Sequence, residues 1–340
     1  MTGQAPLATT FPKIRGETRM YKKPHCPVIA IEEHYWDEEL AKTYTGSESG
    51  RPGEQQKRLY DFDTLRIAEM DAVGIDMQVL SLGAPSTQKL PADTALALTK
   101  RVNDRLAAQV KKNPKRLAAF AALPTAVPEA AADELERCVK EHGFKGAMMH
   151  GLANGEFLDG KKFWPIYTRA EALDVPVYFH PSLPNAEVSR VYYDDYVKDF
   201  PTVARPAWGY TVETATTAIR LAISGVFEKH PKLKVILGHL GETLPYLVWR
   251  IDQALKRPGQ KSMSFRDIFC GNYYITTSGN FSNPALLCCV MEMSVDHILF
   301  AVDWPFVANP PAIEWMDTVP LSDADKAKIL SGNAQRLLKL

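Results

Sequence analysis

The sequence predicts an α/β protein built as a single (β/α)8 TIM barrel. Eight short apolar runs recur along the chain, and amphipathic stretches with apolar residues at three- and four-residue spacings separate them. No glycine-rich phosphate loop follows the first run, which disfavours a doubly wound sheet. The length of 340 residues suits one large barrel with insertions.

The expected strands are short and rich in β-branched or small apolar residues. In chain order they are 28–32, 76–81, 117–123, 144–150, 176–180, 234–239, 273–277 and 298–303. Helical periodicity is clearest over 92–113, 130–143, 214–231 and 243–257, and His142-Gly143 forms a typical helix stop.

The domain organisation is expected to be simple. Residues 1–26 are polar and basic without an apolar centre, so we interpret them as an N-terminal arm rather than a secretory leader. Residues 27–340 form the barrel, with insertions at about 35–61 and 181–207. Both insertions follow strands and should lie at the C-terminal mouth, where such barrels have their active sites.

Composition excludes several classes of protein. Lys+Arg and Asp+Glu are both 40, so nothing favours nucleic acid or an anionic membrane as a partner. No apolar run reaches the roughly 18 residues of a membrane span. The five cysteines are an odd number without regular spacing, which is typical of reduced thiols in a cytoplasmic protein.

Polar side chains with metal-binding capacity occur at the ends of four expected strands. The stretch "VIAIEEHYWDE" ends an apolar run in Glu32 and His34, which alternation places on one face. His180, His239 and Asp303 end the fifth, sixth and eighth strands. Each alone could be structural: a histidine can be hydrogen-bonded, Glu32 can cap a helix or form a salt bridge, and Asp303 can cap the turn before Trp304. In a closed barrel, however, these ends converge on one mouth.

This donor set predicts a metal site. Nitrogen and oxygen ligands without a thiolate suit Zn²⁺ or Mn²⁺, and the two carboxylates favour Mn²⁺ without deciding the choice. Lys145 lies near the start of the fourth strand, away from the mouth, so no lysine is placed to bridge two ions. We therefore expect one divalent ion.

The ordered motifs resemble the metal-dependent decarboxylase branch of the amidohydrolase superfamily, of the γ-resorcylate (2,6-dihydroxybenzoate) decarboxylase type. Glu-x-His replaces the His-x-His of many relatives. The matching stretches are "IEEH", "MDAVGIDMQVLSLGAPSTQ", "FAALP", "ELERCVKEHGFKGAM", "ALDVPVYFHP", "ETATTAIRLAISGVFEKHPKLKVILGHLGETLPYLVWRID", "YYITTSGNF" and "VDWPF".

The resemblance implies roles for individual residues. It assigns one divalent metal to Glu32, His34, His180 and Asp303. It also implies that His239 lies just beyond the metal in contact with substrate or metal-bound water, that Glu242 orients His239, and that Arg250 faces the substrate anion. Homodimers or homotetramers are expected, without an organic cofactor.

The implied activity is non-oxidative decarboxylation of an aromatic acid with a hydroxyl ortho to its carboxylate. Asp303 is the expected proton donor to the ring, helped by His239 and Glu242. The same residues could instead activate water to hydrolyse an ester, lactone or amide. A non-catalytic, metal-stabilised barrel is a third possibility, but such a protein would be expected to have lost at least one of these residues.

The sequence departs from the resembled family in the loops that should touch the ring. The loop after the fourth strand is shorter, and His150 stands where an asparagine is expected. The aromatic residues Tyr35, Trp36, Tyr192, Tyr193, Trp208 and Phe306 are candidates for the walls of the mouth. The reaction class therefore follows from the resemblance better than the identity of the substrate.

Overall fold

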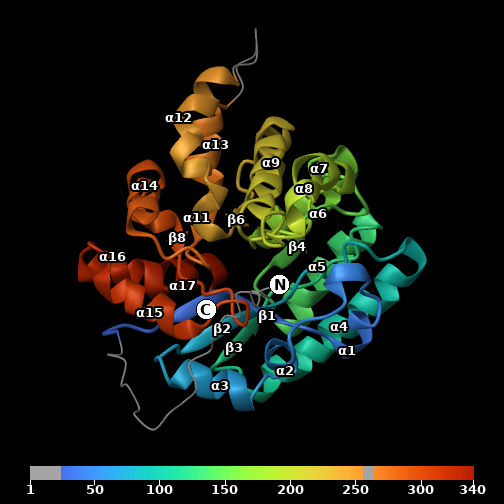
Figure 1. The fold of residues 1–340 in the computed structure, drawn as a ribbon, viewed down its shortest axis with the longest axis horizontal. Helices are drawn as coiled ribbons and strands as arrows, with labels where there is room; N and C mark the ends of the chain where they lie inside the picture. The colour runs from blue at the N-terminus through green and yellow to red at the C-terminus, as the bar shows by residue number, and fades with distance from the viewer. Residues whose placement is uncertain (1–23, 256–262) are drawn as a thin grey trace.

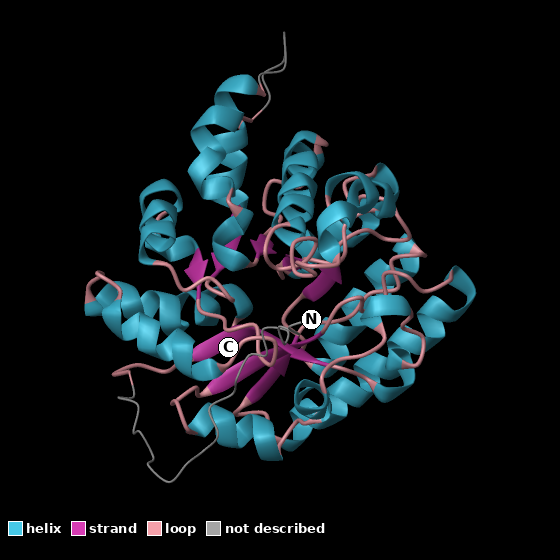
Figure 2. Ribbon diagram, in the orientation of Figure 1, coloured by secondary structure: helices cyan, strands magenta, loops and turns pink. Residues whose placement is uncertain are grey.

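The structure is a computed structural model that describes residues 24–255 and 263–340. The expected N-terminal arm therefore lies, except for residues 24–26, outside the described residues. Within them, strands form a central cylinder and helices surround it (Figures 1 and 2).

All the strand pairings are parallel, as expected for alternating strands and helices. The strands are β1 (Ile29–Tyr35), β2 (Met77–Leu82), β3 (Leu117–Ala119), β4 (Ala147–His150), β5 (Val177–His180), β6 (Val235–Leu237), β7 (Tyr273–Thr276) and β8 (Ile298–Leu299). One sheet has the order β1-β2-β3 and the other β4-β5-β6-β7-β8. Parallel bridges between Ala121 and Ala147 and between Glu33 and Trp304 join the two sheets, which closes the barrel.

The helices fill the connections between the strands. They are α1 (Glu38–Ala41), α2 (Gly53–Tyr60), α3 (Thr64–Asp71), α4 (Ala92–Lys112), α5 (Pro128–His142), α6 (Trp164–Leu173), α7 (Ala186–Tyr192), α8 (Asp194–Val197), α9 (Gly209–Ile223), α10 (Val226–Lys229), α11 (His239–Glu242), α12 (Leu244–Ala254), α13 (Phe265–Asn272), α14 (Asn283–Met293), α15 (Asn309–Thr318), α16 (Asp323–Ala327) and α17 (Asn333–Leu338). Short 3-10 or π turns occur at η1 (Gly46–Glu48), η2 (Lys161–Phe163), η3 (Val295–His297) and η4 (Lys328–Gly332). No helix of the described residues combines the length and apolar character needed to cross a membrane.

The hydrophobic core has two parts. A small cluster inside the barrel takes side chains from every strand, including Ile31, Met148 and Ile236, and residues of α17 pack against it. A larger cluster fills the space between strands and helices. This division is the expected packing of a barrel whose interior is filled by side chains.

Four strands end earlier than the sequence predicts. The expected strand 117–123 stops at Ala119, and the expected strand 273–277 stops at Thr276. The expected strand 234–239 stops at Leu237, and the expected strand 298–303 stops at Leu299. Beyond Leu299 the backbone bonds to other partners: the amide of Val302 donates to the Glu33 carboxylate, and the amide of Asp303 donates to the Glu32 carbonyl. The chain is held there by β1 rather than by a regular ladder.

An irregularity in β1 sets the orientation of the first two candidate ligands. The pairing of β1 with β2 changes register between Ala30 and Glu33. Simple alternation would place Glu33 on the inner face with Ile29 and Ile31, but Glu32 points inward instead. A bulge is a common means of redirecting a side chain near an active site.

The two insertions contain short helices rather than only loops. Residues 35–61 include α1, η1 and α2, and residues 181–207 include α7 and α8. They meet where Arg205 Nη2 donates to Ser47 Oγ at 2.6 Å. This contact joins the connection after β1 to the connection after β5.

Gly146 provides a test of the barrel closure at β4. Its φ is +138°, and a Cβ placed on it would lie 2.2 Å from the Pro176 carbonyl oxygen, just before β5. We predict that Gly146→Ala lowers the free energy of unfolding by about 3 kcal/mol or more, because backbone atoms must move.

The urea midpoint of unfolding measures this effect. Gly271→Ala is the matched control: it lies in α13 with open space around the new methyl group, so it should leave stability unchanged or raise it by up to about 1 kcal/mol. Equal midpoints for the two variants would contradict the described register of β4 against β5.

Candidate metal centre and active site

The structure brings together the four residues expected to bind metal. One ligand atom from each lies within 4.8 Å of those of the others. His34 Nε2 lies 3.2 Å from Asp303 Oδ1, and His180 Nε2 lies 3.3 Å from Glu32 Oε1. Glu32 and His34 are fully buried, and His180 is nearly so. The set comes from β1, the end of β5 and the segment after β8.

The four atoms that converge have no hydrogen-bond partner among the described residues. They are Glu32 Oε1, His34 Nε2, His180 Nε2 and Asp303 Oδ1. Buried polar atoms without partners are costly, and the great majority of such atoms in native proteins are satisfied. Four of them directed at one point, two oxygens and two imidazole nitrogens, fit a divalent cation.

The other ring nitrogen of each histidine ligand is held by the protein. His180 Nδ1 lies 2.7 Å from the Pro181 carbonyl, to which it can only donate, so Nε2 is left as a lone-pair ligand. His34 Nδ1 lies 3.2 Å from Ser81 Oγ on β2. Both rings are therefore oriented with Nε2 toward the cluster.

Three hydroxyl groups hold the second oxygen of Glu32. The hydroxyls of Tyr178, Thr276 and Ser278 donate to Oε2, and Oε1 remains directed at the cluster. Burial alone would raise the pKa of Glu32, but His239, His180 and His34 lower it below its usual value. The carboxylate is therefore ionised.

The sequence analysis did not predict these three hydroxyl groups around Glu32. Tyr178 lies two residues before His180 on β5, and Thr276 and Ser278 are likewise two apart at the end of β7. Period-two spacing from a ligand is the signal that points to Tyr178.

Asp303 is positioned by its backbone neighbours. Glu33 accepts from the amides of Val302 and Trp304, at 2.9 and 3.1 Å, on either side of Asp303. Asp303 itself has a left-handed φ of 75° and donates its amide to the Glu32 carbonyl. Glu33 therefore fixes the turn that presents Asp303 beside His34.

His239 and Glu242 form a pair at the edge of the cluster. His239 Nδ1 lies 2.7 Å from Glu242 Oε1, and His239 Nε2 lies 3.7 Å from Glu32 Oε1. His239 begins α11 rather than ending β6, and every residue from His239 to Thr243 has a positive φ. Backbone strain of this kind is concentrated at functional sites.

The charge of His239 follows from its neighbours. Burial alone would lower the pKa of His239, but the carboxylates of Glu242, Glu32 and Asp303 raise it to about 10. The imidazole therefore carries a proton at neutral pH, and Glu242 holds it in place.

A cavity of about 1130 Å³ opens beside this pair. His239 and Asp303 line it together with apolar and aromatic side chains such as Trp208, Tyr210 and Tyr246. Polar groups at one end of an apolar pocket are typical of a small-molecule site.

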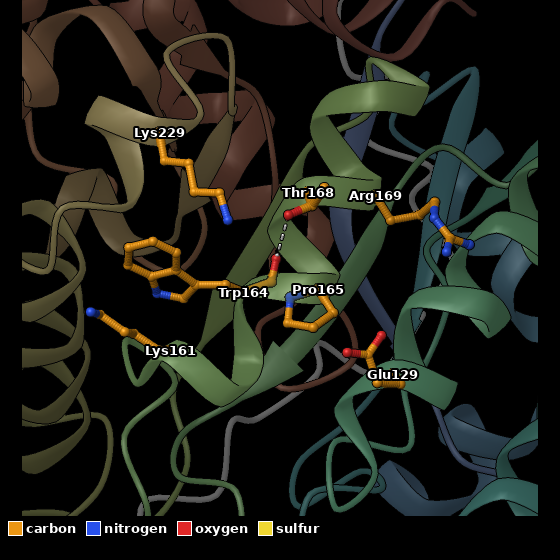
Figure 3. Close-up of a pocket in the computed structure, with 7 residues that line it drawn as sticks. All are labelled: Glu129, Lys161, Trp164, Pro165, Thr168, Arg169 and Lys229. Atoms are coloured by element: carbon orange, nitrogen blue, oxygen red, sulfur yellow. Dashed lines mark hydrogen bonds between the residues drawn. The ribbon is translucent and has the colours of Figure 1, made fainter.

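A separate hollow on the helical layer has a different character (Figure 3). Its lining residues are Glu129, Lys161, Trp164, Pro165, Thr168, Arg169 and Lys229. None of these belongs to the ligand cluster, so we place the active site at the barrel mouth.

Two further residues from the sequence analysis are located differently. Arg250 is exposed on α12 and is not among the residues that line the cavity. His150, at the end of β4, is 1% exposed, and its ring centroid lies 4.7 Å from that of His180. Neither of its ring nitrogens has a well-formed hydrogen bond among the described residues, although one faces the Leu82 backbone.

Comparisons with known proteins agree with this architecture. The sequence model of the family described as Amidohydrolase matches residues 29–340. A γ-resorcylate decarboxylase from Polaromonas sp. strain JS666 is 42% identical over 327 residues, which cover 92% of this chain and 98% of that protein. A γ-resorcylate decarboxylase from Rhizobium sp. strain MTP-10005 is 40% identical over 328 residues, with the same coverage.

Solved structures show the same similarity. A 2,6-dihydroxybenzoate decarboxylase complexed with 2,6-dihydroxybenzoate has a TM-score of 0.85 and 40% identity, and the match covers 93% of this chain and 100% of that one. A dihydroxybenzoic acid decarboxylase from Polaromonas sp. JS666, with bound manganese and the inhibitor 2-nitroresorcinol, has a TM-score of 0.85 and 41% identity over 93% and 97% of the chains. The chain belongs to the amidohydrolase family, within its metal-dependent decarboxylase branch.

Proposed function

We propose that this enzyme, a carboxy-lyase, removes CO2 non-oxidatively from an aromatic acid that has a hydroxyl ortho to its carboxylate. The observation that carries the proposal is the convergence of four unpartnered ligand atoms beside the His239–Glu242 pair. The similarity to γ-resorcylate decarboxylases along almost the whole chain supports this reaction over hydrolysis.

One divalent ion would be held by Glu32, His34, His180 and Asp303. The two carboxylate oxygens and the bound manganese of a related structure favour Mn²⁺ over Zn²⁺. Such an ion, when bound, supplies Lewis acidity and a fixed point for the carboxylate and phenol oxygens. Lys145 donates to the Lys339 carbonyl near the C-terminus, so it is not placed as a bridge between two ions.

Asp303 would deliver the proton that the reaction needs. The proton adds to the ring carbon that bears the carboxylate, and the bond from that carbon to the carboxylate carbon then breaks. The electron pair of this bond returns to the ring, which becomes aromatic again as CO2 leaves. No oxidant and no organic cofactor are needed.

His239 would hold a second proton close to Asp303. Both side chains lie next to Gly279 at the cavity wall. A methyl group placed on this glycine would be 3.6 Å from His239 Cδ2 and 3.9 Å from Asp303 Oδ2. The protonated imidazole can donate to the substrate hydroxyl and can restore the proton of Asp303 after turnover. Glu242 keeps the ring charged and oriented.

Arg250 remains a candidate for binding the substrate anion at the rim of the cavity. It lies one helical turn after Tyr246, which lines the cavity, and therefore on the same side of α12. Its guanidinium can bind a carboxylate in a bidentate manner.

We also propose that the chain forms homodimers or homotetramers in the cytoplasm. Tyr246 and Trp249 on α12 are 83% and 69% exposed, and Met291 on α14 is 87% exposed. Exposed large apolar groups on neighbouring helices are typical of a subunit interface. The five cysteines are free thiols, as is usual in a reducing compartment.

Loss of Asp303 tests the reaction. With Mn²⁺-loaded protein and 2,6-dihydroxybenzoate in D2O, ring-proton NMR should show deuterium at the former carboxylate carbon. Asp303→Asn should slow this reaction by about 100-fold or more, whereas Asp296→Asn, an exposed carboxylate paired with Lys328, should not. Turnover of aryl esters or lactones with inert hydroxybenzoates would instead indicate a hydrolase.

Loss of His180 tests the metal site. His180→Ala removes one of four ligands, so the purified variant should lose its bound metal while the barrel stays folded. The measurement is the number of metal ions per chain, determined by elemental mass spectrometry of the purified protein. His142→Ala, at the end of α5 and bonded to Asp104, is the control and should keep its metal. Full metal content in His180→Ala would show that the ligands are wrongly assigned.

Loss of Glu242 tests the charge of His239. Because the pKa of His239 is raised, the stabilisation from the pair is fully present below the usual histidine pKa of about 6.5 and is lost as pH rises through about 10. Glu242→Gln should lower the pKa of His239, measured by NMR of the metal-free protein.

The control for this experiment is Glu171→Gln, which removes the carboxylate beside His230 on the helical layer. It should leave the pKa of His239 unchanged. An unchanged value in Glu242→Gln would exclude Glu242 as the group that holds the proton on His239.

A further inference from the structure

The hollow on the helical layer is lined by an indole with a lysine on either side of it (Figure 3). Its volume is about 510 Å³, and Trp164, at the start of α6, forms its aromatic wall. Lys161 comes from η2, just before α6, and Lys229 comes from the end of α10. A hollow of this size suits a small molecule rather than a folded partner.

The indole of Trp164 is held in one orientation. Its Nε1 donates to the Asp159 carbonyl at 3.1 Å. Its six-membered ring packs near Gly225, where an added Cβ would lie 3.9 Å from Cη2. Trp164 is only partly buried, so part of the ring faces the hollow. A rigid indole offers a large contact area to another planar ring at a low cost in side-chain entropy.

A chain of hydrogen bonds joins the two sides of the hollow. The buried residue His230 directly follows α10, and its Nε2 lies 3.0 Å from Thr168 Oγ1. The other ring nitrogen, Nδ1, lies 3.0 Å from Glu171 Oε2. Thr168 also donates to the Trp164 carbonyl at 3.0 Å (Figure 3). These bonds hold α6, which carries Trp164, against the end of α10, which carries Lys229, so the hollow is preformed.

The positive charge beside the indole comes from Lys161 and Lys229. Neither ammonium group has a carboxylate within ion-pair distance in the part of the chain that the structure describes. Lys229 Nζ lies 5.5 Å from the Trp164 ring centroid, where it is attracted to the π face. Glu129 also lines the hollow, but it lies on the other side of Pro165 from the indole (Figure 3). An anionic group placed on the indole is therefore closer to two ammonium groups than to this carboxylate.

A third cation of the hollow is already neutralised. Arg169 donates to the carboxylates of Asp133 and Glu136, and its guanidinium points away from the indole (Figure 3). The free positive charge of the described lining residues is therefore that of the two lysines. This charge matches one carboxylate, whereas a nucleotide would bring several negative charges into the hollow.

We propose that this hollow is a second binding site, which takes a small aromatic carboxylate. The ring of the ligand stacks on Trp164, and its carboxylate pairs with Lys161 and Lys229. The site is separate from the metal ligands, so the inference does not depend on the proposed reaction. Because that reaction removes the group that the lysines bind, the site takes the aromatic acid and not the phenol formed from it.

The test uses 4-bromobenzoate, which lacks the ortho hydroxyl of the proposed substrates. Crystals of Mn²⁺-loaded protein soaked in this acid should show a bromine anomalous peak beside Trp164, and calorimetry should show saturable binding in solution. The uncharged 4-bromobenzamide should bind about 10-fold more weakly or worse, which is the usual effect of losing a hydrogen bond to a charged group. A bromine peak without saturable binding in solution would mean binding at crystal concentration only, and would overturn the proposal.

Variants identify the groups that bind the carboxylate. Lys161→Met combined with Lys229→Met should weaken 4-bromobenzoate about 10-fold or more. Because both lysines are exposed, 4-bromobenzamide binding and thermal unfolding should not change. Lys57→Met combined with Lys162→Met is the control: it removes the same charge from two exposed lysines that are paired with carboxylates, and affinity should stay the same. Equal affinity for the acid in the two double variants would overturn the proposal.

The second site and the active site can fail separately. His180→Ala, which is expected to lose the metal, should still bind 4-bromobenzoate as tightly as the unmodified protein does. Loss of binding in His180→Ala would place the acid at the barrel mouth and overturn the second site. If no hydroxybenzoate is decarboxylated but the loss of Lys161 and Lys229 weakens binding, the second site stands and the proposed reaction is wrong.

Discussion

The barrel mouth depends on one constraint, which is the cost of keeping Glu32 and His34 completely out of water. An ionised carboxylate in such a place costs several kcal/mol unless other groups compensate it. The protein satisfies Glu32 Oε2 with three hydroxyls and orients His34 and His180 through Nδ1. One atom on each ligand is left without a partner, so a cation at the point where these atoms meet is the group that balances them.

The same constraint explains the buried polar groups between β1 and the segment after β8. Arg66 is completely buried, donates to the His34 carbonyl at 2.7 Å and to Gln78 at 2.9 Å, and lies 4.1 Å from the Trp304 ring centroid. Burial lowers the pKa of Arg66 to about 9, although Glu33 and other carboxylates oppose this. Together with Glu33, Arg66 holds the backbone of a histidine ligand and of Asp303 in one rigid unit, as a preorganised site requires.

Much of this could be predicted from the sequence, because barrel strands are buried on both faces and appear as short apolar runs. Five metal-capable side chains were predicted to meet because strand ends converge in a closed barrel, and the family resemblance singled out Glu32, His34, His180 and Asp303 among them. The structure brings these four candidate ligands together. The predicted ends of β6 and β8 were wrong because side chains, rather than neighbouring strands, bind the backbone there. The His239 amide after β6 donates to Ser278 Oγ, and the Val302 amide after β8 donates to Glu33. The exposure of Arg250 could not be predicted, since it depends on which face of α12 packs against the rest of the barrel.

The metal site is best tested by anomalous diffraction at the manganese absorption edge, with crystals grown in Mn²⁺ and 2,6-dihydroxybenzoate. We expect one strong peak per chain, bonded to Glu32, His34, His180 and Asp303, with the acid beside His239. A peak bonded to other residues, two peaks at the mouth, or an acid bound away from the metal would contradict this assignment.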